Sequence, residues 1–116
     1  ELLTKRQYEN WTIFRFGIDL ANVEDIDLVF RGPNEYSDAI LIRRIDEENF
    51  QTLNIEFEEY SSDFKEHGHD PEKCDLIICA YHDWKEKFPN EKCPLPVYVV
   101  GEKNVVKEKF FQKEEY

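Results

Sequence analysis

The chain has 116 residues, 41% of them hydrophobic and 15% aromatic, so we expect residues 1–116 to form a single domain with a real core. It carries 26 acidic and 15 basic residues, a net charge of −11. This balance argues against general nucleic-acid binding, which relies on Lys and Arg to neutralise phosphates. No stretch approaches the ~18 apolar residues of a membrane span.

Residues 2–21 are predicted to form a helix. Two sets of apolar side chains recur there at spacings of three and four: Trp11, Phe14 and Ile18, and Ile13, Phe16 and Leu20. This spacing predicts a helix that is buried on two sides. The alternation from Phe14 to Leu20 would also suit a strand. The helix is favoured because the run is long and has Gly17 as its sole turn residue.

Three strands are expected next, at residues 26–31, 37–44 and 53–58. The turn signal Gly32-Pro33-Asn34 separates the first two, and the polar sequence DEEN at 46–49 separates the second from the third. Short connections of this kind predict an antiparallel meander.

The strand at 53–58 has two different faces. Leu53, Ile55 and Phe57 alternate with polar residues and are expected to pack on the core. The opposite face carries Glu56 and Glu58, which this pattern assigns to water.

A short helix is predicted after this strand. Ser61 and Ser62 would cap its first free amides with their hydroxyls, and Gly68 would end it in a left-handed conformation. Residues 74–80 then contain a run that is apolar on both faces, as expected for a central strand. A helix between two neighbouring strands makes a right-handed crossover, so we expect the strands at 53–58 and 74–80 to run parallel.

A final strand is expected at 96–100, and residues 102–116 are a charged tail or a terminal helix. The order is helix, three-strand meander, helix, strand, strand. It predicts an α/β fold with a mixed sheet flanked by helices.

Three cysteines are present. Cys74 and Cys79 are expected on opposite faces of one strand, where they cannot bridge each other. Free thiols indicate a reducing compartment, which favours the cytoplasm. A structural zinc is an alternative. Its candidate ligands are His67, His69, His82 and the three cysteines, Cys74, Cys79 and Cys93. Their spacing lacks a C-x₂-C pair, which favours buried thiols and polar loop histidines instead. His67 and His69 follow the helix after the acidic strand, where either could contact a substrate phosphate.

The element order, together with Asp38 and the Glu56-Phe57-Glu58 triplet, resembles the PD-(D/E)XK nuclease superfamily, which has the restriction-endonuclease-like fold. The resemblance covers roughly residues 8–100, and the segment HGHDPEKCDLIIC is similar to a microbial branch of that superfamily. Its signature is an Asp at the start of the second strand and Glu-x-Lys, or a variant, on the third. Here Ser37 stands where the family often has Pro, and Glu58 stands where it usually has Lys.

The resemblance implies a metal site. Asp38 and Glu56 come from adjacent strands, so their carboxylates can converge on one sheet face. They would hold Mg²⁺, or Mn²⁺ as a substitute, with the carbonyl of Phe57 as a third ligand. Glu58 would hold a second ion or a metal-bound water. Lys65 would supply the lysine that is absent at position 58. The alternative without a functional site is that Glu56 and Glu58 are exposed strand residues and that Lys65 is a solvated helix lysine.

The expected function is a metal-dependent endonuclease that hydrolyses phosphodiester bonds, with DNA as the favoured substrate and a homodimer mate or protein partner supplying the basic surface. The alternative is a catalytically silent nuclease-like interaction module or subunit of a larger nucleic-acid-processing complex. A plain structural domain with an acidic face is the third hypothesis. The charge of −11 and Glu58 favour the silent module, whereas the cluster of three acids favours the nuclease.

Overall fold

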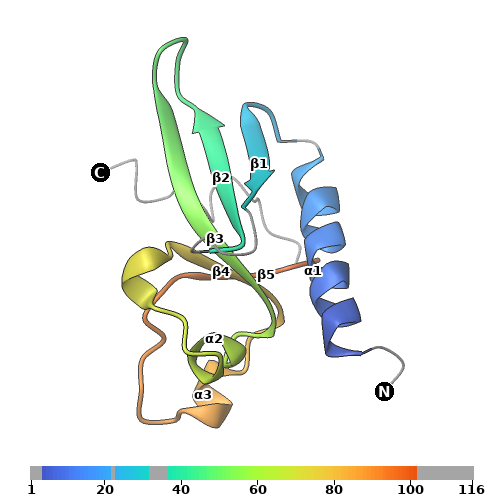
Figure 1. The fold of residues 1–116 in the computed structure, drawn as a ribbon, viewed down its shortest axis with the longest axis vertical. Coiled ribbons are helices and arrows are strands. Elements are labelled where there is room, and N and C mark those ends of the chain that lie inside the picture. The colour runs from blue at the N-terminus through green and yellow to red at the C-terminus, as the bar shows by residue number, and fades with distance from the viewer. Residues whose placement is uncertain (1–3, 22, 32–36, 102–116) are drawn as a thin grey trace.

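The computed structural model describes residues 4–21, 23–31 and 37–101. Figure 1 shows a sheet with the long first helix along one side and the short helices near its lower end. The elements in chain order are α1 (Lys5–Leu20), β1 (Ile26–Phe30), β2 (Ala39–Arg44), β3 (Phe50–Tyr60), α2 (Asp63–Glu66), a 3₁₀ turn (Pro71–Lys73), β4 (Leu76–Tyr81), α3 (Trp84–Lys87) and β5 (Val97–Val99). The expected tail at 102–116 and the turn at 32–34 lie outside the described residues.

The five strands form one mixed sheet in the order β1-β2-β3-β4-β5. β1, β2 and β3 are antiparallel neighbours, which confirms the meander. β4 runs parallel to β3, with Ile55 opposite Leu76 and Glu58 opposite Cys79, and β5 runs parallel to β4. The α/β class and the parallel crossover through α2 are therefore as predicted.

α1 begins with a capping box. The Gln7 amide donates to Thr4 Oγ1, and the Thr4 amide donates to the Gln7 side chain. The helix is confirmed, but only one of its two apolar stripes is buried. Phe16 is inaccessible to solvent, with Ile13 and Leu20 packed around the same core. The other stripe is Trp11, Phe14 and Ile18, whose residues are 40%, 67% and 46% exposed. The prediction of a helix buried on two sides was therefore wrong, because the described residues place no second layer against that stripe.

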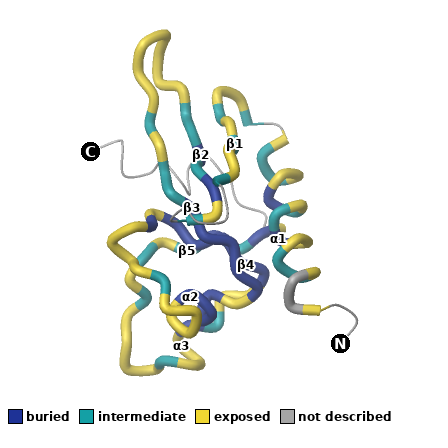
Figure 2. The backbone as a smooth tube through the Cα atoms, viewed as in Figure 1, coloured by how far each residue is buried: buried dark blue, intermediate teal, exposed yellow. Residues whose placement is uncertain are grey.

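The sheet carries a hydrophobic core on each face at its lower end. The core on the α1 side contains Phe16, Leu41, Ile55, Ile78 and Tyr98, among others. The core on the other face is made by Phe64, Cys74, Ile77, Cys79 and Trp84. β4 contributes to both cores, as its run of apolar residues predicted. Figure 2 shows the buried tube concentrated in β4, the end of β3 and α2, whereas the far ends of β1 to β3 are more exposed.

The cysteine prediction needs one correction. All three cysteines are free, as expected. β4 begins at Leu76, however, so Cys74 precedes the strand and ends the 3₁₀ turn. Cys74 and Cys79 consequently lie in the same core and not on opposite faces of one strand.

The turn from β3 into α2 also differs from expectation. Ser62 is the residue before α2, but its hydroxyl makes no cap and instead donates to Asp83 Oδ2 at 2.9 Å. The helix does end where predicted, since Gly68 has a φ of +73°. No helix in the described part of the chain is long and apolar enough to cross a membrane.

Candidate metal centre

Glu56 and Glu58 lie on the face of β3 opposite α1. The sequence assigned this face to water, and the structure corrects that assignment: the two residues are only 5% and 1% exposed. The chain that follows β3 turns back over them, bringing Phe64, His67 and His69 onto this face. Two carboxylates are thereby removed from water, which is unfavourable for ionised groups without a compensating charge.

Asp38 lies immediately before β2, beside Glu56. Its backbone amide donates to the carbonyl of Ile55 at 2.8 Å, and its carboxylate Oδ2 accepts a hydrogen bond from the amide of Phe57 at 2.8 Å. The structure therefore brings Asp38 and Glu56 together at the edge of the β2–β3 ladder. Phe57 is part of the arrangement through its amide, and its side chain packs in the core on the α1 side.

The residue before Asp38 has an unusual backbone. Ser37 has a φ of +60°, in the left-handed region. Proline fixes φ near −65°. A proline at position 37 would therefore not fit the backbone seen here.

The three acids perturb one another. Burial raises the pKa of Glu56 to about 8, with further contributions from the charge of Asp38 and a hydrogen bond to its side chain. Burial likewise raises the pKa of Glu58 to about 9, helped by the charges of Asp63 and Glu56. Without a cation, these shifts favour the protonated form of both glutamates at neutral pH.

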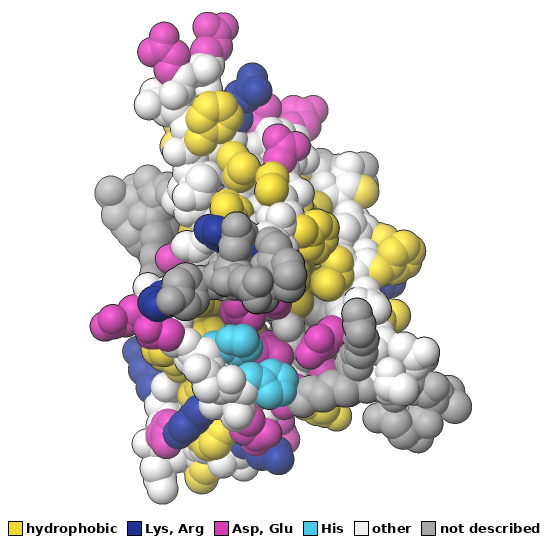
Figure 3. Space-filling model, viewed as in Figure 1, with side chains coloured by type: hydrophobic (Ala, Val, Ile, Leu, Met, Phe, Trp, Pro, Cys, Tyr) yellow, Lys and Arg dark blue, Asp and Glu magenta, His cyan; other side chains and the backbone are white. Residues whose placement is uncertain are grey.

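Two histidines contact the buried glutamates. His67 Nδ1 lies 3.2 Å from Glu58 Oε1, and His69 Nε2 lies 3.2 Å from Glu58 Oε2 and 3.4 Å from Glu56 Oε2. Figure 3 shows histidine side chains among acidic ones on this face of the molecule. One ligand atom from each of Glu58, His67 and His69 lies within 4.8 Å of the others, so this group could hold a metal ion.

The conformation of the HGH tripeptide explains why both rings reach the acids. The His67 amide donates to the carbonyl of Asp63, which closes the last turn of α2. Gly68 then reverses the chain with its positive φ. The His69 ring packs against Phe64 at 5.3 Å between centroids, and burial lowers the pKa of His69, which favours the neutral imidazole.

The remaining candidates for a structural zinc lie elsewhere. Cys74 donates to the Leu76 carbonyl, and burial raises the pKa of its thiol to about 12, so without a metal it is a neutral thiol. His82 Nδ1 lies 2.7 Å from Ser61 Oγ. Among the described residues no cysteine joins a group of metal-ligand type, and the cysteine-containing zinc site finds no support.

Lys65 is not brought to the carboxylates. Its ammonium pairs with the Glu91 carboxylate and lies 4.5 Å from the centroid of the Phe88 ring. Both partners of this ion pair are nearly half exposed. The role expected for Lys65 at a substrate phosphate stays a prediction.

The sequence missed two neighbours of the site. Glu9, from α1, raises the pKa of both Glu56 and Glu58 through its charge. Asp63 is buried at the start of α2, where its carboxylate accepts from the Tyr60 amide at 3.1 Å. The predicted helix start at Ser61 and Ser62 could have indicated Asp63, but the residue was not singled out. Glu9 lies far away in sequence, and no local pattern indicated it.

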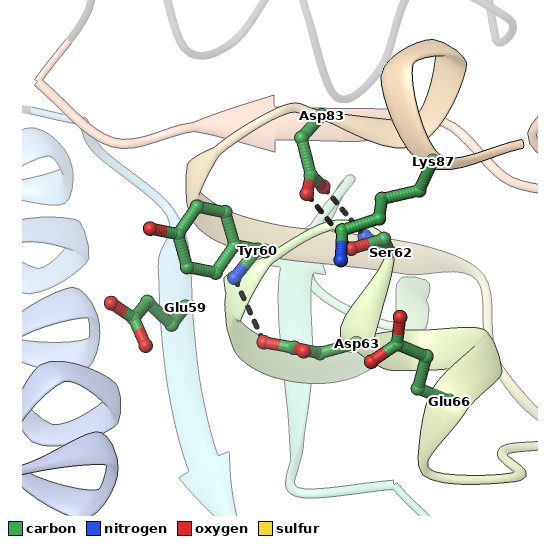
Figure 4. Close-up of a pocket in the computed structure, with 7 residues that line it drawn as sticks. All are labelled: Glu59, Tyr60, Ser62, Asp63, Glu66, Asp83 and Lys87. Atoms are coloured by element: carbon green, nitrogen blue, oxygen red, sulfur yellow. Dashed lines mark hydrogen bonds between the residues drawn. The ribbon is translucent and has the colours of Figure 1, made fainter.

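A separate pocket opens at the carboxyl ends of β3 and β4, with a volume of about 440 Å³. Figure 4 shows it lined by Glu59, Tyr60, Ser62, Asp63, Glu66, Asp83 and Lys87. Ser61, His82 and Asp83 adjoin it and have the residue types of a hydrolytic triad. Ser61 is fully buried, however, and its hydroxyl already accepts from the Asp83 amide at 3.1 Å. These residues therefore tie the ends of β3 and β4 together, and they do not form a nucleophile.

A comparison with protein-family models, with curated proteins and with solved structures found no match. The role of the site is therefore argued from its own geometry and chemistry.

Proposed function

We propose that this protein hydrolyses phosphodiester bonds of nucleic acid, with DNA as the favoured substrate, in a reaction that depends on a divalent metal ion. One observation carries the proposal. Asp38 lies beside Glu56, Glu56 and Glu58 are buried on the same face of β3, and among the described residues no Lys or Arg pairs with either glutamate. A divalent cation bound at this face would displace the protons that the two glutamates otherwise hold and would compensate their buried charge.

The donors available fit such an ion. Asp38 and Glu56 offer the hard carboxylate oxygens that Mg²⁺ and Mn²⁺ prefer, and Asp38 remains accessible from solvent. A bound divalent ion supplies an activated water and neutralises charge on the phosphate. The Phe57 amide fixes the orientation of Asp38, so this ligand is positioned in advance. The Phe57 carbonyl as a further ligand is part of the proposal.

The element order adds support. A helix, a three-strand meander, a crossover helix and a parallel strand are what the PD-(D/E)XK resemblance implies, with the acids at the start of the second strand and on the third. The net charge of −11 leaves the basic surface for nucleic acid to a second copy of the chain or to another protein.

A different observation favours a second candidate function. Trp11, Phe14 and Ile18 follow one stripe of α1 and are exposed. Such a stripe suits a protein partner, as in the hypothesis of a silent interaction module within a larger nucleic-acid-processing complex.

The test is cleavage of single- and double-stranded DNA and of RNA with Mg²⁺ or Mn²⁺. We expect wild-type protein to cut at least one of them and the Asp38→Asn, Glu56→Gln double variant to be inactive. The matched control is Asp27→Asn with Glu86→Gln, which removes two exposed acids far from the site in sequence and should retain activity. Equal activity of the site variant and wild type would overturn the proposal. Metal binding without any cleavage would favour the interaction module.

A further inference from the structure

The carboxylate of Glu58 is left incompletely satisfied. The residue is 1% exposed, and its Oε2 atom is buried without a hydrogen bond. His69 Nε2 lies 3.2 Å from that atom, but the contact does not have the geometry of a hydrogen bond. A buried carboxylate oxygen without a hydrogen bond is costly, and natural proteins rarely leave one unless something else binds there.

The spacing of the donors is that of ligands around one ion. His67 Nδ1 and Glu58 Oε1 are 3.2 Å apart, as are His69 Nε2 and Glu58 Oε2. Two ligand atoms that each lie about 2.0 Å from a tetrahedral ion are separated by roughly 3.3 Å. Each histidine therefore already lies at ligand spacing from one Glu58 oxygen, and one ligand atom from each of the three residues lies within 4.8 Å of the others, so the side chains would have to draw closer to share one ion.

The donor types distinguish this group from Asp38 and Glu56. Mg²⁺ takes oxygen ligands almost exclusively, whereas imidazole nitrogen suits the transition metals, with affinity rising from Mn²⁺ towards Zn²⁺. We propose that Glu58, His67 and His69 form a transition-metal site that prefers Zn²⁺ and Mn²⁺ to Mg²⁺. Its ligand set of two histidines and one carboxylate differs from the all-oxygen pair Asp38 and Glu56, which it adjoins through the contact of His69 Nε2 with Glu56 Oε2 at 3.4 Å.

The site would keep an open position. Three protein ligands leave a four-coordinate ion one place for water or substrate. The side chains of His67 and His69 are each 34% exposed, so that place faces solvent while Glu58 closes the inner side. This arrangement suits a reactive metal more than a purely structural one.

The inference deepens the proposed function by naming the metal class at the same face of β3, but it can be tested without any cleavage. Metal-free protein would be titrated with Zn²⁺ and with Mn²⁺ by calorimetry, alone and in millimolar Mg²⁺, and the bound metal counted after dialysis. We expect one Zn²⁺ per chain, tighter binding of Zn²⁺ than of Mn²⁺, and little competition from Mg²⁺.

The variants are His67→Asn, His69→Asn and Glu58→Gln. Loss of an outer contact to a metal ligand typically lowers affinity 10- to 100-fold, so removing a ligand itself should cost roughly tenfold or more. His82→Asn is the matched control: it removes the third histidine of the chain, which lies outside the group, and should bind Zn²⁺ like wild type. Circular dichroism of each variant would establish that it is folded. His67, at the exposed end of α2, is the substitution least disruptive to packing.

The outcomes separate this inference from the proposed function. Zn²⁺ binding that depends on both histidines, without cleavage of any nucleic acid, would support the inference and overturn the function. Mg²⁺-dependent cleavage that is unchanged in His67→Asn and His69→Asn, with unchanged Zn²⁺ affinity, would do the reverse. Competition by Mg²⁺ at concentrations equal to Zn²⁺ would also overturn the inference.

Discussion

Asp38 accepts a hydrogen bond from the backbone amide of Phe57, with 2.8 Å between Oδ2 and the amide nitrogen. The bond crosses from the residue before β2 to the middle of β3. It holds a charged side chain beside Glu56, whose pKa is raised by burial and, in addition, by that charge. The Asp38 carboxylate therefore has two roles. It ties the chain before β2 to β3, and it places a negative charge beside Glu56.

Two substitutions at Asp38 should separate these roles. Asp38→Asn keeps an oxygen that can accept from the Phe57 amide but removes the charge, so the metal-free protein should be as stable as wild type or more stable. Asp38→Ala loses the acceptor as well and should cost about 1 kcal/mol. Urea unfolding in a chelator measures the difference. Metal-dependent cleavage should be lost in both variants, and a stable, fully active Asp38→Asn would contradict the role in metal binding.

The stability of the metal-free protein should fall as pH rises from about 6.5 to 8.5. Glu56 and Glu58 have folded pKa values of about 8 and 9, above the ordinary value of 4.5, so in this range the folded state binds more protons than the unfolded chain. For each carboxyl that is protonated in the folded state and ionised in the unfolded chain, the free energy of unfolding falls by up to about 1.4 kcal/mol for every unit by which the pH rises. The charges of the neighbouring acids Asp63, Glu9 and Asp38 add to the effect of burial, because each of them also raises the pKa of Glu58.

His69 limits the lower end of that pH window. The lowered pKa of His69 gives stability that is lost below pH 6.5, so urea unfolding is best compared above it. Saturating Mn²⁺ should flatten the slope, because the metal displaces the same protons. Stability that rises with pH in chelator would be inconsistent with buried, protonated glutamates.

Much of the fold followed from local patterns. The spacing of Ile13, Phe16 and Leu20 predicted α1, and the apolar run at 76–80 predicted a central strand, because each pattern reports directly on burial. Short turns then determined the meander, and the crossover rule determined the direction of β4.

The site was harder to predict, because its glutamates are buried by residues that lie outside β3 and reach them only through the tertiary fold. Alternation along β3 correctly placed Glu56 and Glu58 on the face opposite the α1-side core, but it assigned them to water, and no local signal showed that His67 and His69 would cover them. That depends on the reversal at Gly68 and on Phe64 packing against Cys74 and Trp84. The histidines were considered for zinc with cysteine partners, and the structure groups them with a glutamate instead.

Substitutions at Glu58 distinguish between two roles of position 58. The PD-(D/E)XK resemblance implies a lysine there, whereas in the structure Glu58 lies with His67 and His69 as a potential metal ligand. Glu58→Gln should lose Zn²⁺ binding and, without its buried acid, should be at least as stable as metal-free wild type at pH 8. Glu58→Lys restores the common family triplet and places a cation near Glu56, Asp63 and Glu9, so it should fold yet bind no Zn²⁺ and lose cleavage. Calorimetry and a nuclease assay measure both effects. Cleavage that survives or rises in Glu58→Lys would mean that Glu58 is not a required ligand.

Lys65→Ala tests the cation expected to face the substrate phosphate. Its ion pair with Glu91 is exposed, so its loss should change the free energy of unfolding by no more than about 1 kcal/mol. Metal affinity should be unchanged. A fall in turnover for Lys65→Ala but not for Glu91→Gln, which breaks the same pair from the other side, would support the role at the phosphate. Equal turnover in both variants would restrict Lys65 to the ion pair.

The same substitution at two glycines should have opposite effects. Gly17 lies within α1, and a Cβ added there meets nothing within 4 Å, so Gly17→Ala should stabilise the protein by about 1 kcal/mol through helix propensity. A Cβ at Gly68 is equally free of contacts, but the φ of +73° is unfavourable for alanine. Gly68→Ala should therefore destabilise by about 1 kcal/mol or more.

The substitution Gly68→Ala should also weaken Zn²⁺ binding. If the chain relieves the strain at position 68 by leaving the left-handed region, His67 and His69 no longer point to the same carboxylate, and Zn²⁺ affinity should fall by roughly tenfold. Gly68→Asn is the conservative comparison, since Asn tolerates this conformation better than Ala and should retain more of the affinity. Thermal unfolding and calorimetry on the three variants measure both quantities. Wild-type Zn²⁺ affinity in a destabilised Gly68→Ala protein would show that the turn supports the fold without positioning the ligands.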